Sequence, residues 1–228
     1  MNNDARGLLM QSEQARERGD FKKSLELLSD AIVAIVEERK EEKLVDALAS
    51  QALVYRHLSD KTTSKNYLVL AKHSAMASVE LARLGSDTTL LSMAIYNLGK
   101  VQESLGDDDD ALSSYREAVL LDANRLAMLS EMKTRLSVLE YKKGDTTALE
   151  RFESSLNDLI SAEDKDSYAK CVWLSGAYMH MAEALFETDK NKAKELLDEA
   201  GKVIASDMRL KLRKEQLEKL RIKITTNS

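Results

Sequence analysis

The sequence predicts an all-α protein, built as an α-solenoid of about five antiparallel helix pairs with a further helix capping the C-terminal end. Three observations predict it: the absence of proline, a short break motif that recurs along the chain, and a pattern of small and large residues beside each break. Because one unit is repeated throughout, we expect residues 1–228 to form a single domain.

The composition favours helix over the whole chain. The 228 residues include 0 Pro, and only 5% are aromatic, whereas average composition would give about 11 prolines. Without proline every residue keeps its backbone N–H donor, so none is barred from a helix. Strands, in turn, lack the aromatic residues they prefer. The one run with strand character, residues 31–36, lies inside a longer stretch of helical polarity.

Five breaks interrupt the helical pattern, each a small or hydroxyl residue followed by aspartate. Glycine can end a helix in the left-handed conformation, and aspartate can cap the N-terminus of the next helix. Such breaks at intervals of 38 to 47 residues indicate a repeated helix–turn–helix unit. They are Gly19-Asp20, Ser59-Asp60, Gly106-Asp107, Gly144-Asp145 and Thr188-Asp189.

The residues on either side of the breaks repeat as well. Small residues let the two helices of a pair approach closely, and a bulky residue between them fills the space to the next unit. Before the breaks the small residues are Ser12, Ala52, Gly99, Ser137 and Ala182. After them the small–large–small sets are Ser24, Leu28, Ala31; Ala71, Ala75, Ser78; Ala111, Tyr115, Ala118; Ala148, Phe152, Ser155; and Ala193, Leu197, Ala200. Ala75 departs from the pattern, since a large residue is expected there.

Together the breaks and their flanks predict five repeats, over residues 4–40, 42–84, 88–122, 124–161 and 165–205. A capping helix over residues 207–224 follows, with Ser206-Asp207 as its N-terminal cap. The pattern leaves one alternative open, in which this last helix continues the preceding one without a break.

The third unit carries a recognisable signature. It reads Ile95-x2-Leu98-Gly99-x2-Gln102, then Gly106-Asp107, then Ala111-x3-Tyr115-x2-Ala118. This resembles the tetratricopeptide repeat (TPR), with Ile95 in place of Trp, Gln102 in place of Tyr, and Ala123 where proline often falls. The longer interval is similar to repeats of about 40 residues, and the resemblance covers roughly residues 4–205. It implies a right-handed superhelix whose concave groove is lined by the first helix of each pair.

Charge and sequence motifs exclude several classes of function. A net charge of −5 and a pI near 5.4 give no general attraction to nucleic acid. The single cysteine, Cys171, fits a reducing compartment. The sequence shows no N-terminal signal peptide and no run approaching about 18 apolar residues. We therefore expect a cytoplasmic protein without membrane insertion.

Neither catalysis nor metal binding is predicted. The acidic run Asp107–Asp110 is typical of a first helical turn, where carboxylates favour the helix dipole. His57, His73, His180 and Cys171 do not share a spacing typical of metal ligands. No motif for nucleotide binding or nucleophilic catalysis occurs. The sequence thus predicts no enzyme, no metal and no cofactor.

The resemblance instead points to the concave groove as the site. Its predicted partner-binding residues are Arg56, Tyr96, Asn97, Lys100, Arg135 and Tyr141. Three of them, Asn97, Lys100 and Arg135, could donate to a carboxylate or to the carbonyls of an extended peptide. The chaperone-binding members of the family clamp a carboxylate with five residues. At the five corresponding positions of this sequence, only Asn97 and Arg135 are the residues of the clamp. Ala49, Leu53 and Glu131 stand at the other three positions, so binding of a C-terminal carboxylate is not predicted.

These observations predict a non-catalytic interaction module that binds a peptide or a partner helix in its groove. The alternative is a ligand- or peptide-sensing regulatory domain of a signalling system, and a homo-oligomer is left open. The C-terminal helix is basic and amphipathic, which suits a cap with a polar outer face. The same features also suit a helix that lies on an anionic membrane or in a partner's acidic groove.

Overall fold

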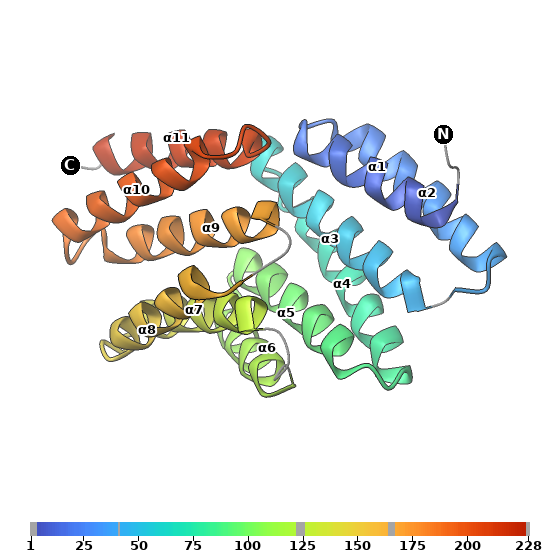
Figure 1. Cartoon of the computed structure of the whole chain (residues 1–228), viewed down its shortest axis with the longest axis horizontal. Helices are drawn as coiled ribbons and strands as arrows, with labels where there is room; N and C mark the ends of the chain where they lie inside the picture. The colour runs from blue at the N-terminus through green and yellow to red at the C-terminus, as the bar shows by residue number, and fades with distance from the viewer. Residues whose placement is uncertain (1–3, 41, 122–125, 164–166, 227–228) are drawn as a thin grey trace. The chain divides into compact units, whose positions relative to one another are not determined.

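The computed structural model describes residues 4–40, 42–121, 126–163 and 167–226. These residues contain eleven α-helices and no strand (Figure 1). They divide into two compact units, with α1 to α6 in the N-terminal unit and α7 to α11 in the C-terminal unit. The predicted all-α repeat fold is confirmed, and a single superhelical domain over residues 1–228 stays a prediction.

The N-terminal unit consists of three helix pairs. Within each pair the two helices pack along one another, and α3 also packs against α2 and α5 (Figure 1). Helix α4 also contacts α5, so the second pair is joined to the third through both of its helices. The pairs are α1 (Ala5–Glu17) with α2 (Phe21–Glu37), α3 (Glu42–Thr62) with α4 (Asn66–Leu84), and α5 (Thr88–Leu105) with α6 (Asp108–Leu121).

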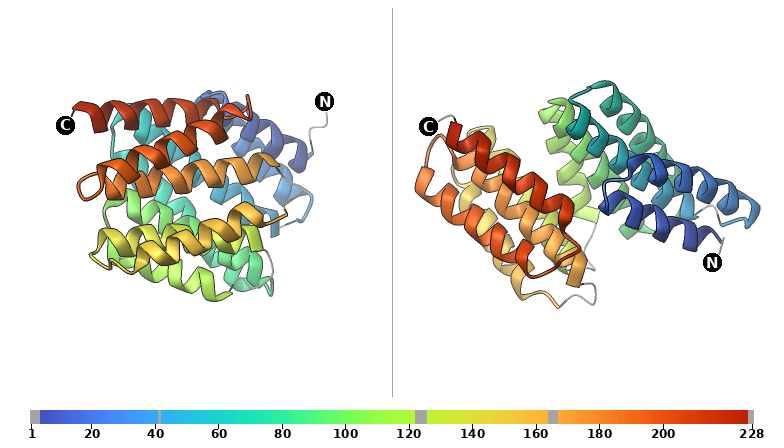
Figure 2. Two further views of the ribbon diagram at one scale, coloured as in Figure 1. Left: turned by 60° about the vertical axis from the view of Figure 1, so that its left-hand side comes forward. Right: turned by 90° about the horizontal axis from the view of Figure 1, so that it is seen from above.

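The C-terminal unit contains two pairs and the predicted cap (Figure 2). Leu210, Leu217 and Ile224 are buried where α11 packs against α9 and α10, so α11 is a separate covering helix. The alternative of one continuous last helix is wrong, because α10 ends at Ala205 and α11 begins at Lys211. The prediction that Ser206-Asp207 caps the last helix is also wrong, because Ser206 ends α10 and α11 begins four residues after Asp207. The helices are α7 (Leu126–Lys142), α8 (Ala148–Ser161), α9 (Ser167–Leu185), α10 (Lys190–Ala205) and α11 (Lys211–Thr226).

Small side chains meet inside the helix pairs, as the repeat pattern predicts. In the first pair the hydroxyl oxygens of Ser12 and Ser24 lie 2.9 Å apart, and each hydroxyl also contacts the other residue's backbone carbonyl. In the third pair Gly99 lies directly under the ring of Tyr115, which is 0% exposed. All the small and large residues of the predicted pattern are buried.

Most of the predicted breaks lie between helices. Gly19, Gly106 and Gly144 all have a positive φ, between 77° and 99°, which glycine adopts without strain. Asp20 caps α2, accepting the backbone N–H of Lys23 at 3.1 Å, and Asp189 caps α10 in the same way.

The prediction of a break at Ser59-Asp60 is wrong. Helix α3 continues through both residues to Thr62, and the chain turns at Thr63, which has a φ of 57°. Ser59 lacks the freedom with which glycine ends a helix in the left-handed conformation. Residue preference does not explain the turn at Thr63, since the β-branched threonine favours that conformation no more than serine does. Asp60 lies inside α3 and caps no helix, and α4 begins after Lys65 without a side-chain cap.

Gly99 supplies a direct test of the close approach. A Cβ at this position would lie 2.6 Å from Cε1 of the buried Tyr115 ring. We expect Gly99→Ala to lower the free energy of unfolding by about 1–3 kcal/mol, because overpacking outweighs the gain in helix propensity. Chemical denaturation measures the change.

Gly201 is the matched control, since it too lies within a helix. A Cβ there would approach the flexible guanidinium of Arg221 at 3.3 Å, and this group can move. We expect Gly201→Ala to be neutral or to stabilise by up to about 1 kcal/mol. Equal effects of the two substitutions would show that Gly99 is not under steric constraint.

The turn before α8 is held by a charged cluster around Asp145. The Asp145 carboxylate accepts hydrogen bonds from the hydroxyl of Thr147 at 2.7 Å and from Nη2 of Arg151 at 2.6 Å. These donors lower the pKa of Asp145 from 3.8 to about 2, with the Thr147 hydroxyl as the largest cause. The ionised carboxylate therefore stabilises the folded turn above pH 3.8, and this contribution is lost as the pH falls through about 2.

Thr147→Ala should consequently raise the pKa of Asp145 toward its ordinary value. The measurement is an NMR titration of the side-chain carboxyl carbon in the wild-type chain and in the variant. An unchanged midpoint for Asp145 would refute the part assigned to the Thr147 hydroxyl.

Candidate binding groove between α3 and α5

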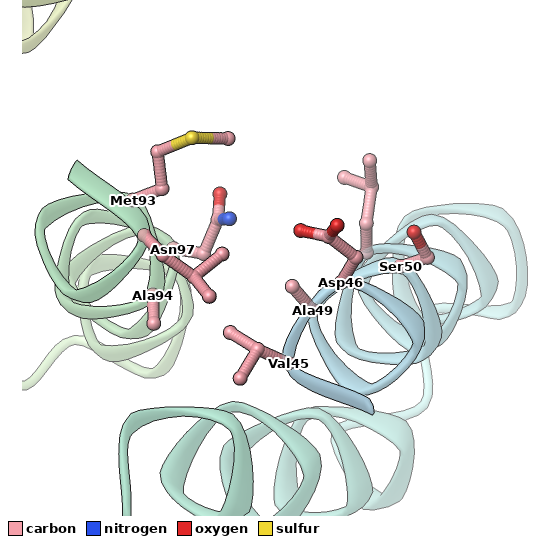
Figure 3. A pocket seen from close by; sticks show the side chains of 9 residues that line it. Val45, Asp46, Ala49, Ser50, Met93, Ala94 and Asn97 are labelled. Atoms are coloured by element: carbon pink, nitrogen blue, oxygen red, sulfur yellow. The ribbon is translucent and has the colours of Figure 1, made fainter. Parts of the chain in front are cut away.

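A groove of about 220 Å³ separates the first helices of the second and third pairs in the N-terminal unit (Figure 3). Each helix contributes residues that recur at i, i+3, i+4 and i+7, which places them along one face. The lining residues are Val45, Asp46, Ala49, Ser50 and Leu53 from α3, and Leu90, Met93, Ala94 and Asn97 from α5.

The groove has an apolar base and a polar rim. Val45 and Ala94 are only 3% and 1% exposed and lie deepest, and the carbonyl of Val45 accepts a hydrogen bond from Ser78 of α4 at 2.9 Å. Asp46 is exposed and Asn97 is half-buried, and their side chains project from facing helices at the mouth (Figure 3). Helix α4 therefore supports the back of the groove, and the mouth presents polar atoms.

The core beside the groove holds its two helices in place. Ala52 is 1% exposed and packs with Ala71, Ala75 and Val101 in the core between α3, α4 and α5. Ala49 lies three residues earlier, about 60° round the helix from Ala52, and faces the groove. The core thus joins α3 and α5 next to the groove, while the short side chain of Ala49 leaves space unfilled inside it.

The chemistry of the groove is that of recognition. Six of its nine lining residues are apolar, and the polar ones are Asp46, Ser50 and Asn97. The amide of Asn97 can donate and accept hydrogen bonds, whereas the ionised carboxylate of Asp46 only accepts. Among the residues that the structure describes, no group of three His, Cys, Asp or Glu side chains could hold a metal ion.

Of the six residues predicted from the sequence, only Asn97 lines this groove. Arg56 donates from Nε to Ser104 Oγ on α5 at 3.2 Å. Tyr96 is 4% exposed and packs against Tyr115, with their ring centroids 5.4 Å apart. Lys100 Nζ lies 4.2 Å from the centroid of the Tyr96 ring. The sequence analysis places Tyr96 on the groove surface, whereas in the structure its ring belongs to the core.

The other two predicted residues lie in the C-terminal unit. Arg135 on α7 is 8% exposed, and the hydroxyl of Tyr141 lies 3.1 Å from Oγ1 of Thr188. A role for these residues in partner binding stays a prediction.

Most of the groove lining was not predicted, although the resemblance to TPR proteins offered a signal. Ala49, Leu53 and Asn97 stand at three of the five positions compared above with the carboxylate clamp, and all three line the groove. Position in the repeat therefore identifies the lining better than side-chain polarity does. Leu90 and Met93 lie on the same face of α5 and follow from its helical spacing.

Comparison with known proteins defines the fold. No family model and no curated protein sequence matches the chain. A solved structure of a putative kinesin light chain with nearly identical TPR-like repeats, from Podosopora anserina, aligns with a TM-score of 0.57 at 13% identity. The alignment covers 90% of this chain and 96% of that one. The chain has a TPR-like helical repeat fold.

A second TPR-like structure also aligns with the chain. It is a Rap protein complexed with competence and sporulation factor, with a TM-score of 0.41 and 14% identity over 97% of this chain and 76% of that one. Within the described part of the TPR-like chain, every helix is too short or too polar to cross a membrane.

Ala49 and Ala52 of α3 should respond differently to the same substitution, because one faces the groove and the other the core. Ala49→Leu extends into the open groove, and we expect the free energy of unfolding to change by less than about 0.5 kcal/mol. Ala52→Leu overfills the core and should cost about 1–3 kcal/mol. Chemical denaturation of both variants compares them, and an equal loss would show that the space beside Ala49 is not open.

Proposed function

We propose that this TPR-like protein is a non-catalytic interaction module that binds a segment of another protein in the groove between α3 and α5. The observation that carries the proposal is the groove itself, whose base is buried and apolar and whose rim offers Asp46, Ser50 and Asn97. Apolar surface supplies binding energy, and a few polar groups fix orientation. The lone Cys171 suits a reducing compartment, which supports a cytoplasmic location as part of this proposal.

An extended segment or one face of a helix fits this geometry. One or two side chains would enter between Ala49 and Ala94, and the half-buried Met93 can adapt its shape to them. The Asn97 amide would hydrogen-bond the backbone of the segment and hold its direction. The two groove helices are fixed by the core beside the groove, so little of the binding energy is spent on ordering the site.

The size of the groove favours a polypeptide over a small metabolite. Small-molecule sites are usually enclosed and measure about 300–1,000 Å³, whereas this groove is smaller, at about 220 Å³, and is only partly enclosed. A chain segment uses such a groove by extending beyond it on both sides. We therefore favour the interaction module over a ligand-sensing domain.

The experiment is partner capture with a filled groove. Ala49→Trp places an indole in the groove, and we expect it to weaken binding of any groove-bound partner at least tenfold while the melting temperature is preserved. Cross-linking mass spectrometry identifies captured proteins, and titration of each purified partner by calorimetry measures its affinity for the wild type and the variant.

Ala77→Trp is the matched control, because Ala77 is exposed on α4 and does not line the groove. It introduces the same indole and should leave the affinity unchanged. Partners that bind the wild type and Ala49→Trp equally well would place the interaction elsewhere and refute the groove.

A further inference from the structure

We infer that the C-terminal helix α11 is exchanged between two copies of the chain, so that the α11 of each copy packs on α9 and α10 of the other. The inference concerns the C-terminal unit and goes beyond the proposed function, because it does not depend on the groove between α3 and α5. It rests on the surface that receives α11, on the five residues that join α11 to α10, and on the charges in the first turn of α11.

Helix α11 packs against α9 and α10 along one stripe of side chains (Figure 1). Leu217 and Ile224 are buried, as is Leu210 just before the helix, and all three belong to the core of the C-terminal unit. Their spacing of seven residues places them on one face of a helix. At the edge of the stripe, Nζ of Lys223 lies 2.7 Å from Oε1 of Glu183 on α9. The contact therefore depends on this particular pattern of apolar and basic residues.

Two glycines bring the backbones of α9 and α10 close to α11. Glycine in the middle of a helix is unfavourable, so its presence there calls for a reason. A Cβ at Gly176 of α9 would lie 3.4 Å from Nη2 of Arg213, and one at Gly201 of α10 would lie 3.3 Å from Nη2 of Arg221. The same nitrogen of Arg221 donates to the carboxylate of Asp198 on α10 at 3.0 Å. The surface thus receives the two arginines of α11 at close range.

A second copy of the chain carries the same helix and therefore fits the same surface. Every contact that α11 makes with α9 and α10 can form equally well when α11 comes from another copy. Exchange of an identical element is for this reason a route to a dimer that requires no new surface. Only the link over residues 206–210 differs between the two arrangements, so this link and the protein concentration decide the balance.

The link between α10 and α11 can itself become helical. It reads Ser206-Asp207-Met208-Arg209-Leu210 and contains neither glycine nor proline. None of these five described residues has a positive φ, and Ser206 already has helical angles, with φ −76° and ψ −16°. A helical link joins α10 and α11 into one straight helix, in which α11 projects past the end of its own unit. It can then pack on α9 and α10 only in a second copy.

The charges in the first turn of α11 favour the straight form. Lys211, Arg213 and Lys214 lie in this turn, which contains no acidic residue. The N-terminus of a helix carries partial positive charge and N–H groups without helical partners, so cations are unfavourable there. In a continuous helix the same three cations lie in the interior, and their N–H groups bond to the carbonyls of the preceding turn.

Asp207 holds the bend in the single chain. Its carboxylate accepts hydrogen bonds from the backbone N–H of Arg209 at 2.9 Å and from Nη2 of the same residue at 2.6 Å. The Arg209 guanidinium also lies 4.7 Å from the ring centroid of Tyr168 on α9. These contacts oppose the straight form, so the single chain prevails when dilute and the exchanged dimer forms as the concentration rises.

The first test changes the link. Size-exclusion chromatography with light scattering measures the mass of the equilibrated chain over a range of concentrations. We expect the wild-type chain to form a dimer whose fraction rises with concentration, and Asp207→Ala to raise that fraction several-fold. Asp30→Ala is the matched control, since it removes a carboxylate from an exposed position of α2 and should leave the fraction unchanged. A wild-type chain and an Asp207→Ala variant that both stay monomeric would overturn the inference.

The second test identifies the exchanged helix. One variant, Glu183→Lys with Asp198→Lys, reverses two charges of the receiving surface, and the other, Arg221→Glu with Lys223→Glu, reverses their partners on α11. In either variant alone these contacts are repulsive, both within a chain and between identical chains. In the mixture, exchange of α11 restores every pair. We therefore expect dimers that contain one copy of each variant.

Native mass spectrometry of the mixture, with one variant isotope-labelled, measures the pairing. Labelled and unlabelled wild-type chains are the control and should combine at random. Random pairing of the two charge variants would show that another surface joins the copies, and would overturn the exchange of α11, as would a mixture without dimers. Neither result bears on the groove, which is lined by α3 and α5 alone.

Discussion

The close contact of small side chains inside each helix pair is the constraint on which the rest of the structure depends. Ser12 and Ser24 touch through their hydroxyls, and Gly99 leaves room for the ring of Tyr115. Where backbones approach this closely, a large residue nearby can reach outward and fill the space to the next pair. Phe152 does so within the C-terminal unit, where it packs in a core shared with α9 and α10 and is almost fully buried. Bulkier residues at the small positions would separate the helices and leave such side chains without complementary packing.

The groove is a consequence of the same arrangement. The first helix of a pair buries one face against the second helix of that pair and another face against a neighbouring pair. A third face stays outside these contacts. In α3 the buried faces carry Ala52 and Val54, which are each 1% exposed. The remaining face carries Ala49 and Asp46, and the corresponding face of α5 carries Met93 and Asn97. A surface made by two rigid helices is thus produced by the packing that makes the fold, without a loop to order.

The sequence predicts the pairs better than it predicts the site, for a physical reason. Small residues and glycine turns act locally, so their pattern is visible along the chain. The turn after α3 is not visible in this way, because neither Ser59 nor Thr63 has the conformational freedom of glycine and α3 continues to Thr62. The groove depends instead on how α3 and α5 are each rotated about their own axis, because this decides which side chains face one another. Tyr96 and Asn97 are neighbours in sequence, yet successive residues point about 100° apart on a helix, so one is core and the other lines the groove.

An unfilled groove costs stability, which is itself an argument for function. Burial of one methylene group contributes about 0.8 kcal/mol, and alanine at positions 49 and 94 forgoes several such groups where α3 and α5 face one another. A chain that used this space only for folding would gain from larger apolar residues on the two walls and would have no reason to place a carboxylate at the mouth. The short side chains and the buried base are consistent with a space that a partner's side chain fills. In that case the apolar surface of the groove is buried when the partner binds. The free energy of this burial then contributes to binding instead of to folding.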